Sequence, residues 1–271
     1  MPSLPVGCSS IYVEESGRGQ PLIFLSGLGG DSRAFSLAQR HFSKWFRTIA
    51  IDNRDVGRSG RALKPYSTLS MAKDVEAVMD WMKIDAAHIV GHSLGGMIAQ
   101  EIAINQPERV RSLVLASTHC GAEPWRHALL ESWILQRNRM TPAEFSSVTL
   151  PWLVSPGFYQ QGSAQIDGLI RFAERNTWPQ EADAFERQAR AAMGHYSRDR
   201  LSLISTPTLV LVGQDDLVNP PRIARELSDT IVDAQFVEIP GVGHLPHVED
   251  NPSFRHALDL FYNKLGLIPL G

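Results

Sequence analysis

Short runs of strand-forming residues alternate with stretches of helical spacing along most of this chain, and this alternation limits its fold more than any other feature. Several of the runs are apolar throughout, which is typical of strands that a parallel sheet buries on both faces beneath covering helices. We therefore expect an α/β fold. The expected strands are residues 11–14, 22–26, 48–52, 88–90, 113–117, 209–212 and 235–239, and the expected helices include 32–44, 70–82, 94–105 and 222–229.

The alternation stops between Leu115 and Leu209, where helical spacing continues without a convincing strand. We interpret this stretch as a helical cap inserted into the α/β core. On this interpretation residues 1–118 and 202–271 form the core domain, and residues 119–201 form the cap.

Aromatic side chains of the expected cap are candidates for lining a substrate pocket. We single out Trp125 and Trp152, together with Val218 from the core, as candidate substrate-binding residues. A small helical lid also needs a core of its own, so packing inside the cap is the alternative role for any one of its aromatic residues.

The charge balance argues against a polyanionic partner. The chain has 26 Lys and Arg against 29 Asp and Glu, which gives a formal net charge of −3. Without a basic field, neither nucleic acid nor an anionic membrane surface is indicated, so we expect a small-molecule substrate. The first residues lack a positively charged start, and no apolar run approaches the roughly 18 residues that cross a bilayer. The expected location is the cytoplasm, and nothing in the sequence specifies an oligomeric state.

The cysteines and glycines give no sign of a cofactor. Cys8 and Cys120 lie far apart and outside any metal-ligand spacing, so we expect two ordinary thiols. Neither a lysine-bearing phosphate loop nor a dinucleotide fingerprint is present. We therefore expect a reaction that uses no cofactor and no metal ion.

The run GHSLGG at residues 91–96 follows an apolar strand and immediately precedes a helix. Ser93 stands at the turn, and the glycines around it are the small neighbours that a sharp turn needs where strand and helix approach closely. A Gly-x-Ser-x-Gly pattern alone arises by chance in roughly one chain in ten of this length. The strand before it and the helix after it are the context of a nucleophile turn. We interpret Ser93 as the nucleophile.

Two backbone N–H groups are candidates for stabilising an oxyanion. The N–H of Leu94 lies at the start of the helix, where N–H groups lack internal partners and the helix dipole is positive. The N–H of Leu28 lies in the glycine-rich turn that follows the strand at residues 22–26. A flexible turn without a catalytic role is the alternative for this second loop.

A serine nucleophile needs an imidazole base and a carboxylate that orients the imidazole. The run GQDDLVNP places Asp215 and Asp216 at the carboxyl end of a strand, the edge where open α/β sheets place their sites. The run PGVGHLPHVED places His244 after another strand, with His247 as the nearest alternative. We choose Asp216, with Asp215 in reserve, and His244.

These segments, together with SGLGG at residues 26–30, resemble the α/β-hydrolase superfamily over most of the chain outside the cap. The resemblance implies the α/β-hydrolase fold, which is a mostly parallel eight-stranded sheet with helices on both faces and a helical cap inserted after strand six. It selects Asp216 over Asp215, and it selects His244 in its GxGH setting. Within the superfamily the chain is similar to the 3-oxoadipate enol-lactonase and small carboxylesterase branch. One departure is Ser26-Gly27, where many members have His-Gly.

The leading functional hypothesis is hydrolysis of a carboxylic ester or lactone of a small apolar substrate through a Ser-His-Asp acyl-enzyme. Two alternatives stay open. The same triad can cleave a carbon-carbon bond or form a peracid, and a hydrolase fold can serve as a ligand sensor that turns over slowly.

Overall fold

Eight strands form one sheet in the computed structural model, which describes residues 3–6, 9–121 and 123–269. Their order across the sheet is β1-β2-β4-β3-β5-β6-β7-β8. Strand β2 is antiparallel to β1 and β4, and every other neighbouring pair is parallel. The expected mostly parallel, eight-stranded sheet is confirmed. The strands are β1 (Ser3–Val6), β2 (Ser9–Ser16), β3 (Gln20–Leu25), β4 (Phe46–Asp52), β5 (Ala87–His92), β6 (Val110–Ala116), β7 (Thr208–Gly213) and β8 (Gln235–Ile239).

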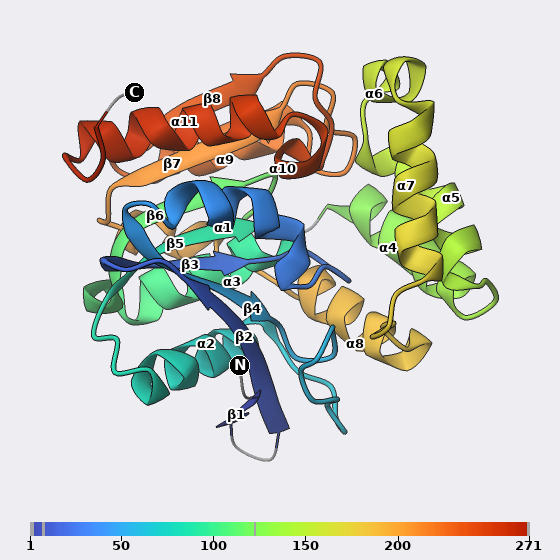
Figure 1. Cartoon of the computed structure of the whole chain (residues 1–271), viewed down its shortest axis with the longest axis horizontal. Helices are drawn as coiled ribbons and strands as arrows, with labels where there is room; N and C mark the ends of the chain where they lie inside the picture. The colour runs from blue at the N-terminus through green and yellow to red at the C-terminus, as the bar shows by residue number, and fades with distance from the viewer. Residues whose placement is uncertain (1–2, 7–8, 122, 270–271) are drawn as a thin grey trace.

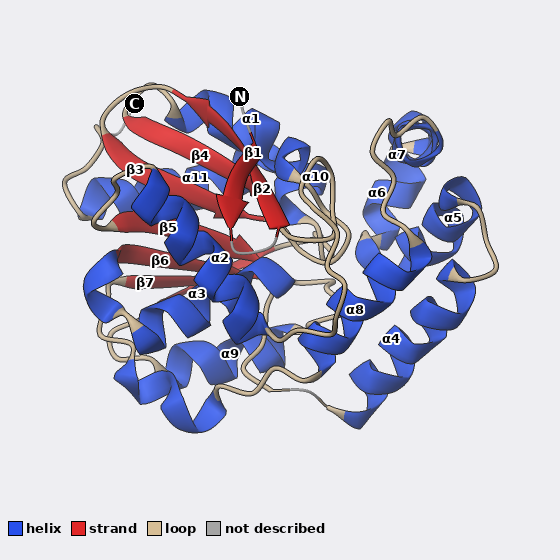
Figure 2. Ribbon diagram, turned by 90° about the horizontal axis from the view of Figure 1, so that it is seen from below, coloured by secondary structure: helices blue, strands red, loops and turns tan. Residues whose placement is uncertain are grey.

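Helices cover both faces of the sheet (Figures 1 and 2). Successive residues of a strand point to opposite faces. Accordingly, Ile23 and Leu25 pack with the helices of one face, whereas Leu22 and Phe24 pack with those of the other. The first face carries α2 (Thr68–Trp81), α3 (Leu94–Asn105) and α9 (Pro221–Thr230), and the second carries α1 (Ser36–Phe42) and α11 (Asn251–Lys264).

Five α-helices lie between β6 and β7 in the described part of the chain, to one side of the sheet (Figure 1). We call them the cap helices, and they confirm the expected helical insertion after the sixth strand. Short helices elsewhere are η1 (Ser32–Phe35), η2 (Pro107–Arg109), η3 (Arg198–Leu203) and α10 (Pro246–Glu249). The cap helices are α4 (Pro124–Arg137), α5 (Pro142–Leu153), α6 (Pro156–Gln161), α7 (Ser163–Glu174) and α8 (Ala182–Met193).

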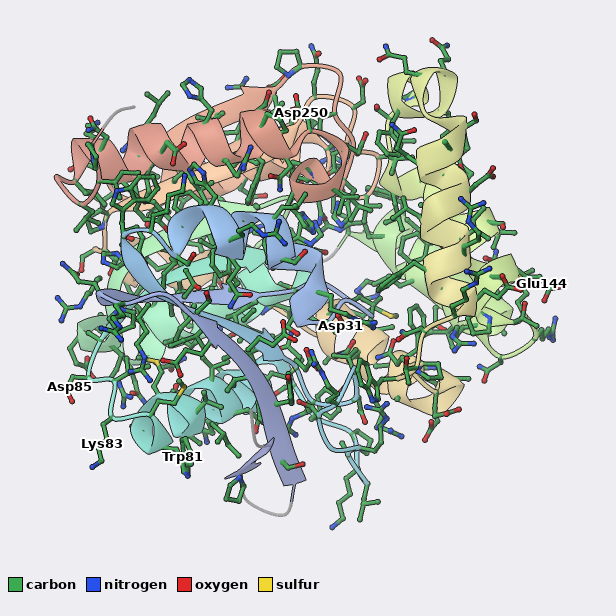
Figure 3. The ribbon with its side chains drawn as sticks, in the orientation of Figure 1. Asp31, Trp81, Lys83, Asp85, Glu144 and Asp250 are labelled. Carbon is green, nitrogen blue, oxygen red and sulfur yellow. The ribbon has the colours of Figure 1, made fainter. Side chains whose placement is uncertain are left out.

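Helix α8 joins the cap helices to the loop that follows β4. Two guanidinium nitrogens of Arg187 contact the buried carboxylate of Asp55 at 2.9 and 3.0 Å. The side chain of Gln188 donates to the carbonyl of Arg54 at 2.9 Å. Figure 3 shows Asp31 at the end of the sheet that faces the cap helices, and Glu144 on their outer side. The contact between the cap helices and the core is therefore polar at α8.

Cys120 is a buried free thiol, and Cys8 lies outside the described residues. Among the helices that the structure describes, none is long and apolar enough to cross a membrane.

The turn between β5 and α3 brings backbone segments into close contact. A Cβ atom added to Gly95 would lie 2.0 Å from the carbonyl oxygen of Leu25 on β3, and one added to Gly91 would lie 2.4 Å from the carbonyl oxygen of Gly95. Only glycine fits at these two positions without a backbone shift. The close approach of strand and helix around Ser93, which the sequence predicts, therefore explains why these neighbours are glycines.

We predict that Gly95→Ala lowers the free energy of unfolding by at least about 2 kcal/mol, because the added methyl group overlaps a backbone oxygen. The matched control is Gly168→Ala in α7, where the added Cβ has nothing within 4 Å. That change is expected to stabilise the protein by up to about 1 kcal/mol through helix propensity. Urea unfolding of the two variants measures both effects, and equal stabilities would contradict the close approach at Gly95.

Candidate active site

Ser93 occupies a strained turn at the carboxyl end of β5. Its φ is 51° and its ψ is −116°, a combination that side-chain-bearing residues rarely adopt. The backbone N–H of Ser93 donates to the carbonyl of Ala116 at 2.9 Å, which fixes the turn to the end of β6. The surrounding structure therefore holds the serine in a conformation that it would not adopt alone.

The structure brings together the three residues that the sequence suggested as a triad. The hydroxyl of Ser93 lies 3.1 Å from Nε2 of His244. Nδ1 of His244 lies 2.9 and 3.0 Å from the two carboxylate oxygens of Asp216. The backbone N–H groups of Val218 and Asn219 also donate to Asp216, at 2.9 and 2.8 Å. The buried carboxylate thus has several donors.

The loop that carries His244 is attached to both the core and the cap helices. Nε2 of His92, the residue before Ser93, contacts the carbonyl oxygen of His244 at 2.8 Å, and the N–H of His244 donates to the carbonyl of Leu153 at 2.9 Å. The carboxyl group of Glu249 contacts the N–H groups of Gly243 and Ser155 at 2.9 and 2.8 Å. Burial raises the pKa of Glu249. These contacts hold the imidazole in place.

The glycine-rich loop after β3 lies beside the serine. A Cβ atom on Gly27 would be 3.1 Å from the Cβ of Ser93. The next N–H groups are those of Leu28, the oxyanion candidate, and of Gly29, which donates to the buried side chain of Gln188 at 3.1 Å. Helix α8 therefore orients this loop through Gln188. The other oxyanion candidate, Leu94, starts α3.

Ser26 supplies the hydrogen bonds that close this loop. Its hydroxyl donates to the carbonyl of Asp31 at 2.9 Å, and its own carbonyl accepts from the side chain of Asn53 at 3.1 Å. Ser26 therefore stabilises this loop on both sides.

A cavity of about 350 Å³ lies between the sheet and the cap helices, and its lining includes Ser93 and His244. Val218, one of the three candidate substrate-binding residues, is among the residues that line it. Trp125 and Trp152 are not among the described residues that line it. Trp125 is partly exposed and donates to the carboxylate of Glu123, and Trp152 is 43% exposed. Aromatic residues that do line the cavity are Trp133, Phe145, Phe172 and Phe185.

Buried histidines surround the site and other parts of the core. Burial lowers the pKa of His88 and His195 to about 4 and that of His247 to about 3, and it also lowers the pKa values of His92 and His119. The ring of His247 stacks on that of Phe35, with centroids 4.7 Å apart, and is tilted against that of His92, with centroids 4.5 Å apart. In the part of the chain that the structure describes, no three His, Cys, Asp or Glu side chains form a group that could hold a metal ion.

We predict that stability falls as pH is lowered from 7.5 to 5.5, and that His247→Phe reduces this fall by about 1 kcal/mol. The unfolded chain takes up a proton at His247 near its ordinary pKa of about 6.5, whereas the folded protein resists protonation until about pH 3. The neutral ring of His247 stabilises the folded protein at pH values above the pKa of this residue in the unfolded chain. This stabilisation is lost as the pH falls below that value. Urea unfolding of both proteins at the two pH values measures this difference, and identical pH dependence would contradict it.

Comparisons with known proteins agree with the fold. A sequence model of the family described as "alpha/beta hydrolase fold" matches residues 20–146. The chain is 28% identical over 256 residues to a protein of Azorhizobium caulinodans provisionally named carbamate hydrolase RutD, covering 90% of this chain and 91% of the relative. It is 27% identical over 241 residues to 3-oxoadipate enol-lactonase 2 of Acinetobacter baylyi, covering 88% and 86% of the two chains.

A solved structure shows the same fold over nearly the whole length. The enol-lactonase from Burkholderia xenovorans superposes with a TM-score of 0.88, covering 97% of this chain and all of that chain, at 20% identity. At 20% identity, this likeness shows a shared fold and nothing about the activity.

Proposed function

We propose that this chain, which has the α/β-hydrolase fold and is a hydrolase, cleaves a carboxylic ester or lactone of a small substrate with an apolar body, using Ser93 as nucleophile. The observation that carries the proposal is the chain of hydrogen bonds from Ser93 through His244 to Asp216 in the lining of an apolar cavity. This arrangement is the one that acyl transfer through a serine requires.

In the first step the substrate carbonyl lies in the cavity beside Ser93. Nε2 of His244 takes the hydroxyl proton while the serine oxygen attacks the carbonyl carbon. Asp216 holds the imidazole through Nδ1 and stabilises the imidazolium that forms. The N–H groups of Leu28 and Leu94 donate to the oxyanion.

In the second step His244 returns its proton to the leaving alcohol, and an acyl group remains on Ser93. A water molecule then attacks this ester while His244 again acts as base, which releases the acid and restores the serine. In a lactone the leaving alcohol stays attached to the acyl chain, so the product is one hydroxy acid or its keto tautomer. Ester hydrolysis and lactone hydrolysis therefore use the same protein groups.

The named relative and the insertion support an ester or lactone substrate. The similar protein of Acinetobacter baylyi is named for an enol-lactone, and ring opening of a lactone is the same acyl transfer. We further propose that residues 119–201 act as the cap domain and residues 1–118 and 202–271 as the catalytic core. Cap side chains such as Trp133 and Phe185 would then exclude water around the substrate.

We predict that Ser93→Ala lowers kcat/KM for p-nitrophenyl butyrate by at least about 1,000-fold, because the nucleophile is lost. Asp216→Asn is expected to lower it by about 1,000- to 10,000-fold, since the amide favours the wrong imidazole tautomer. Asp215→Asn is the matched control, because Asp215 is the adjacent carboxylate and makes no recorded contact with His244. It is expected to stay within about threefold of the parent chain.

Steady-state kinetics and circular dichroism of all three variants check these values. Retention of most activity by folded Ser93→Ala would refute the nucleophile. A large loss in Asp215→Asn together with an active Asp216→Asn would move the acid by one residue.

A further inference from the structure

Arg126 brings a positive charge to a cavity that is otherwise apolar or neutral. It is the one Lys or Arg among the described residues that line the cavity, and no Asp or Glu lines it. The residue is only 4% exposed. Burial lowers the pKa of Arg126 to about 10, so the guanidinium is still charged at neutral pH. The cavity therefore has one strongly charged side.

The guanidinium of Arg126 has neutral partners only. Nη1 donates to the side-chain oxygen of Asn219 at 3.2 Å, and Nη2 donates to the carbonyl of Gly121. Nε is buried and makes no hydrogen bond. The carboxylate of Glu123 in the same segment is paired with Arg222 at 2.6 Å. Within the described residues, Arg126 forms no ion pair.

Two other shielded arginines of this chain have an acid as partner. Arg54 contacts Asp74 at 2.6 Å, and Arg187 contacts Asp55 at 2.9 Å. Removing a charge from water costs several kcal/mol unless an opposite charge and hydrogen bonds compensate it. At Arg126 the charges of Glu123 and Glu226 offset only part of this cost, because burial still lowers its pKa, and a ligand anion in the cavity would pair with it directly.

The position of Arg126 places such an anion close to the reacting groups. Arg126 donates to the side chain of Asn219, and the backbone N–H of Asn219 donates to Asp216 at 2.8 Å. Arg126 and Ser93 line the same cavity. A substrate that extends along this cavity can therefore contact both residues.

The geometry points to Arg126 as a specificity-determining residue that binds a carboxylate on the substrate. The substrate class is then an ester or lactone with an apolar middle and an anionic end. The guanidinium pairs with the anion, and the apolar walls hold the chain between the anion and the scissile carbonyl at Ser93. This inference rests on the proposed ester or lactone hydrolysis.

The test compares pairs of methyl esters that differ only in a terminal carboxylate. The anionic members are the monomethyl esters of succinate, glutarate and adipate, and the neutral members are the methyl esters of the simple acids of the same chain length. Released acid is measured by titration at constant pH. The parent chain is expected to prefer the anionic member of at least one pair by roughly 10- to 100-fold in kcat/KM, as a charge-assisted pair provides.

Arg126→Gln is expected to remove this preference, so that the ratio of kcat/KM for the anionic ester to that for its neutral partner falls to about one. Arg126→Lys keeps the charge without the planar fork, so it should retain part of the preference. Arg137→Gln is the matched control, because Arg137 lies on the same helix, donates to the carbonyls of Gln180 and Met140, and is not among the cavity-lining residues. It should keep the full preference.

Two outcomes would overturn the inference. The first is the absence of a preference in all three pairs of the parent chain. The second is an equal loss of activity on anionic and neutral esters in Arg126→Gln, which would make Arg126 a structural contact between Gly121 and Asn219 only.

Binding to Ser93→Ala separates this inference from the proposed reaction. Calorimetry with monomethyl glutarate and methyl pentanoate needs no turnover, so it reports anion recognition even in a protein that hydrolyses neither ester. The anionic probe should bind at least about tenfold more tightly, and Ser93→Ala/Arg126→Gln should lose that difference. Equal binding of the two probes would overturn the role of Arg126 whatever the reaction is.

Discussion

The carboxyl ends of three parallel strands meet at one edge of the sheet, and the site depends on this constraint. β5 ends at the turn of Ser93, β7 leads to Asp216 and β8 leads to His244. Residues separated by 151 positions in the chain, Ser93 and His244, can thus share a hydrogen bond. The turn is strained, and the bond from Ser93 to the carbonyl of Ala116 and the contact at Gly95 hold it.

The cap helices contribute to the position of the reacting groups as well as to the cavity. Gln188 of α8 accepts from the loop of Leu28, and the carbonyl of Leu153 at the end of α5 accepts from His244. The buried pair of Arg187 and Asp55 fixes α8 to the core. Displacement of these helices would therefore disturb the loop of Leu28 and the loop of His244 together. A hydrophobic contact alone would not specify these orientations so closely.

Local patterns were sufficient to predict the sheet and the turn of Ser93, because an apolar strand, glycines and a helix are adjacent in the sequence. Strand β1 (Ser3–Val6) was not predicted, since Pro5 argues against a strand and is tolerated only at a sheet edge such as this one. Helix α11 (Asn251–Lys264) was also missed, although Asp250 as its cap and the spacing of its buried residues are visible in the sequence.

The cavity was harder to predict because its lining depends on how the cap helices turn against each other. Trp133 faces the cavity whereas Trp125, eight positions earlier on the same helix, bonds to Glu123 at the surface. The sequence around Gln188 and Arg126 likewise gives no sign that these side chains are buried. A buried glutamine or arginine is recognisable only once its burial and its partners are known.

Covalent labelling of the serine tests the central claim most directly. The protein is incubated with diethyl p-nitrophenyl phosphate, which transfers a diethylphosphoryl group to a serine that a neighbouring imidazole activates. Intact-mass and peptide mass spectrometry then locate the label. A single label on the peptide that contains Ser93, absent from Ser93→Ala and strongly slowed in Asp216→Asn, is the predicted result. An unlabelled protein, or a label on another residue that persists in Ser93→Ala, would contradict the account.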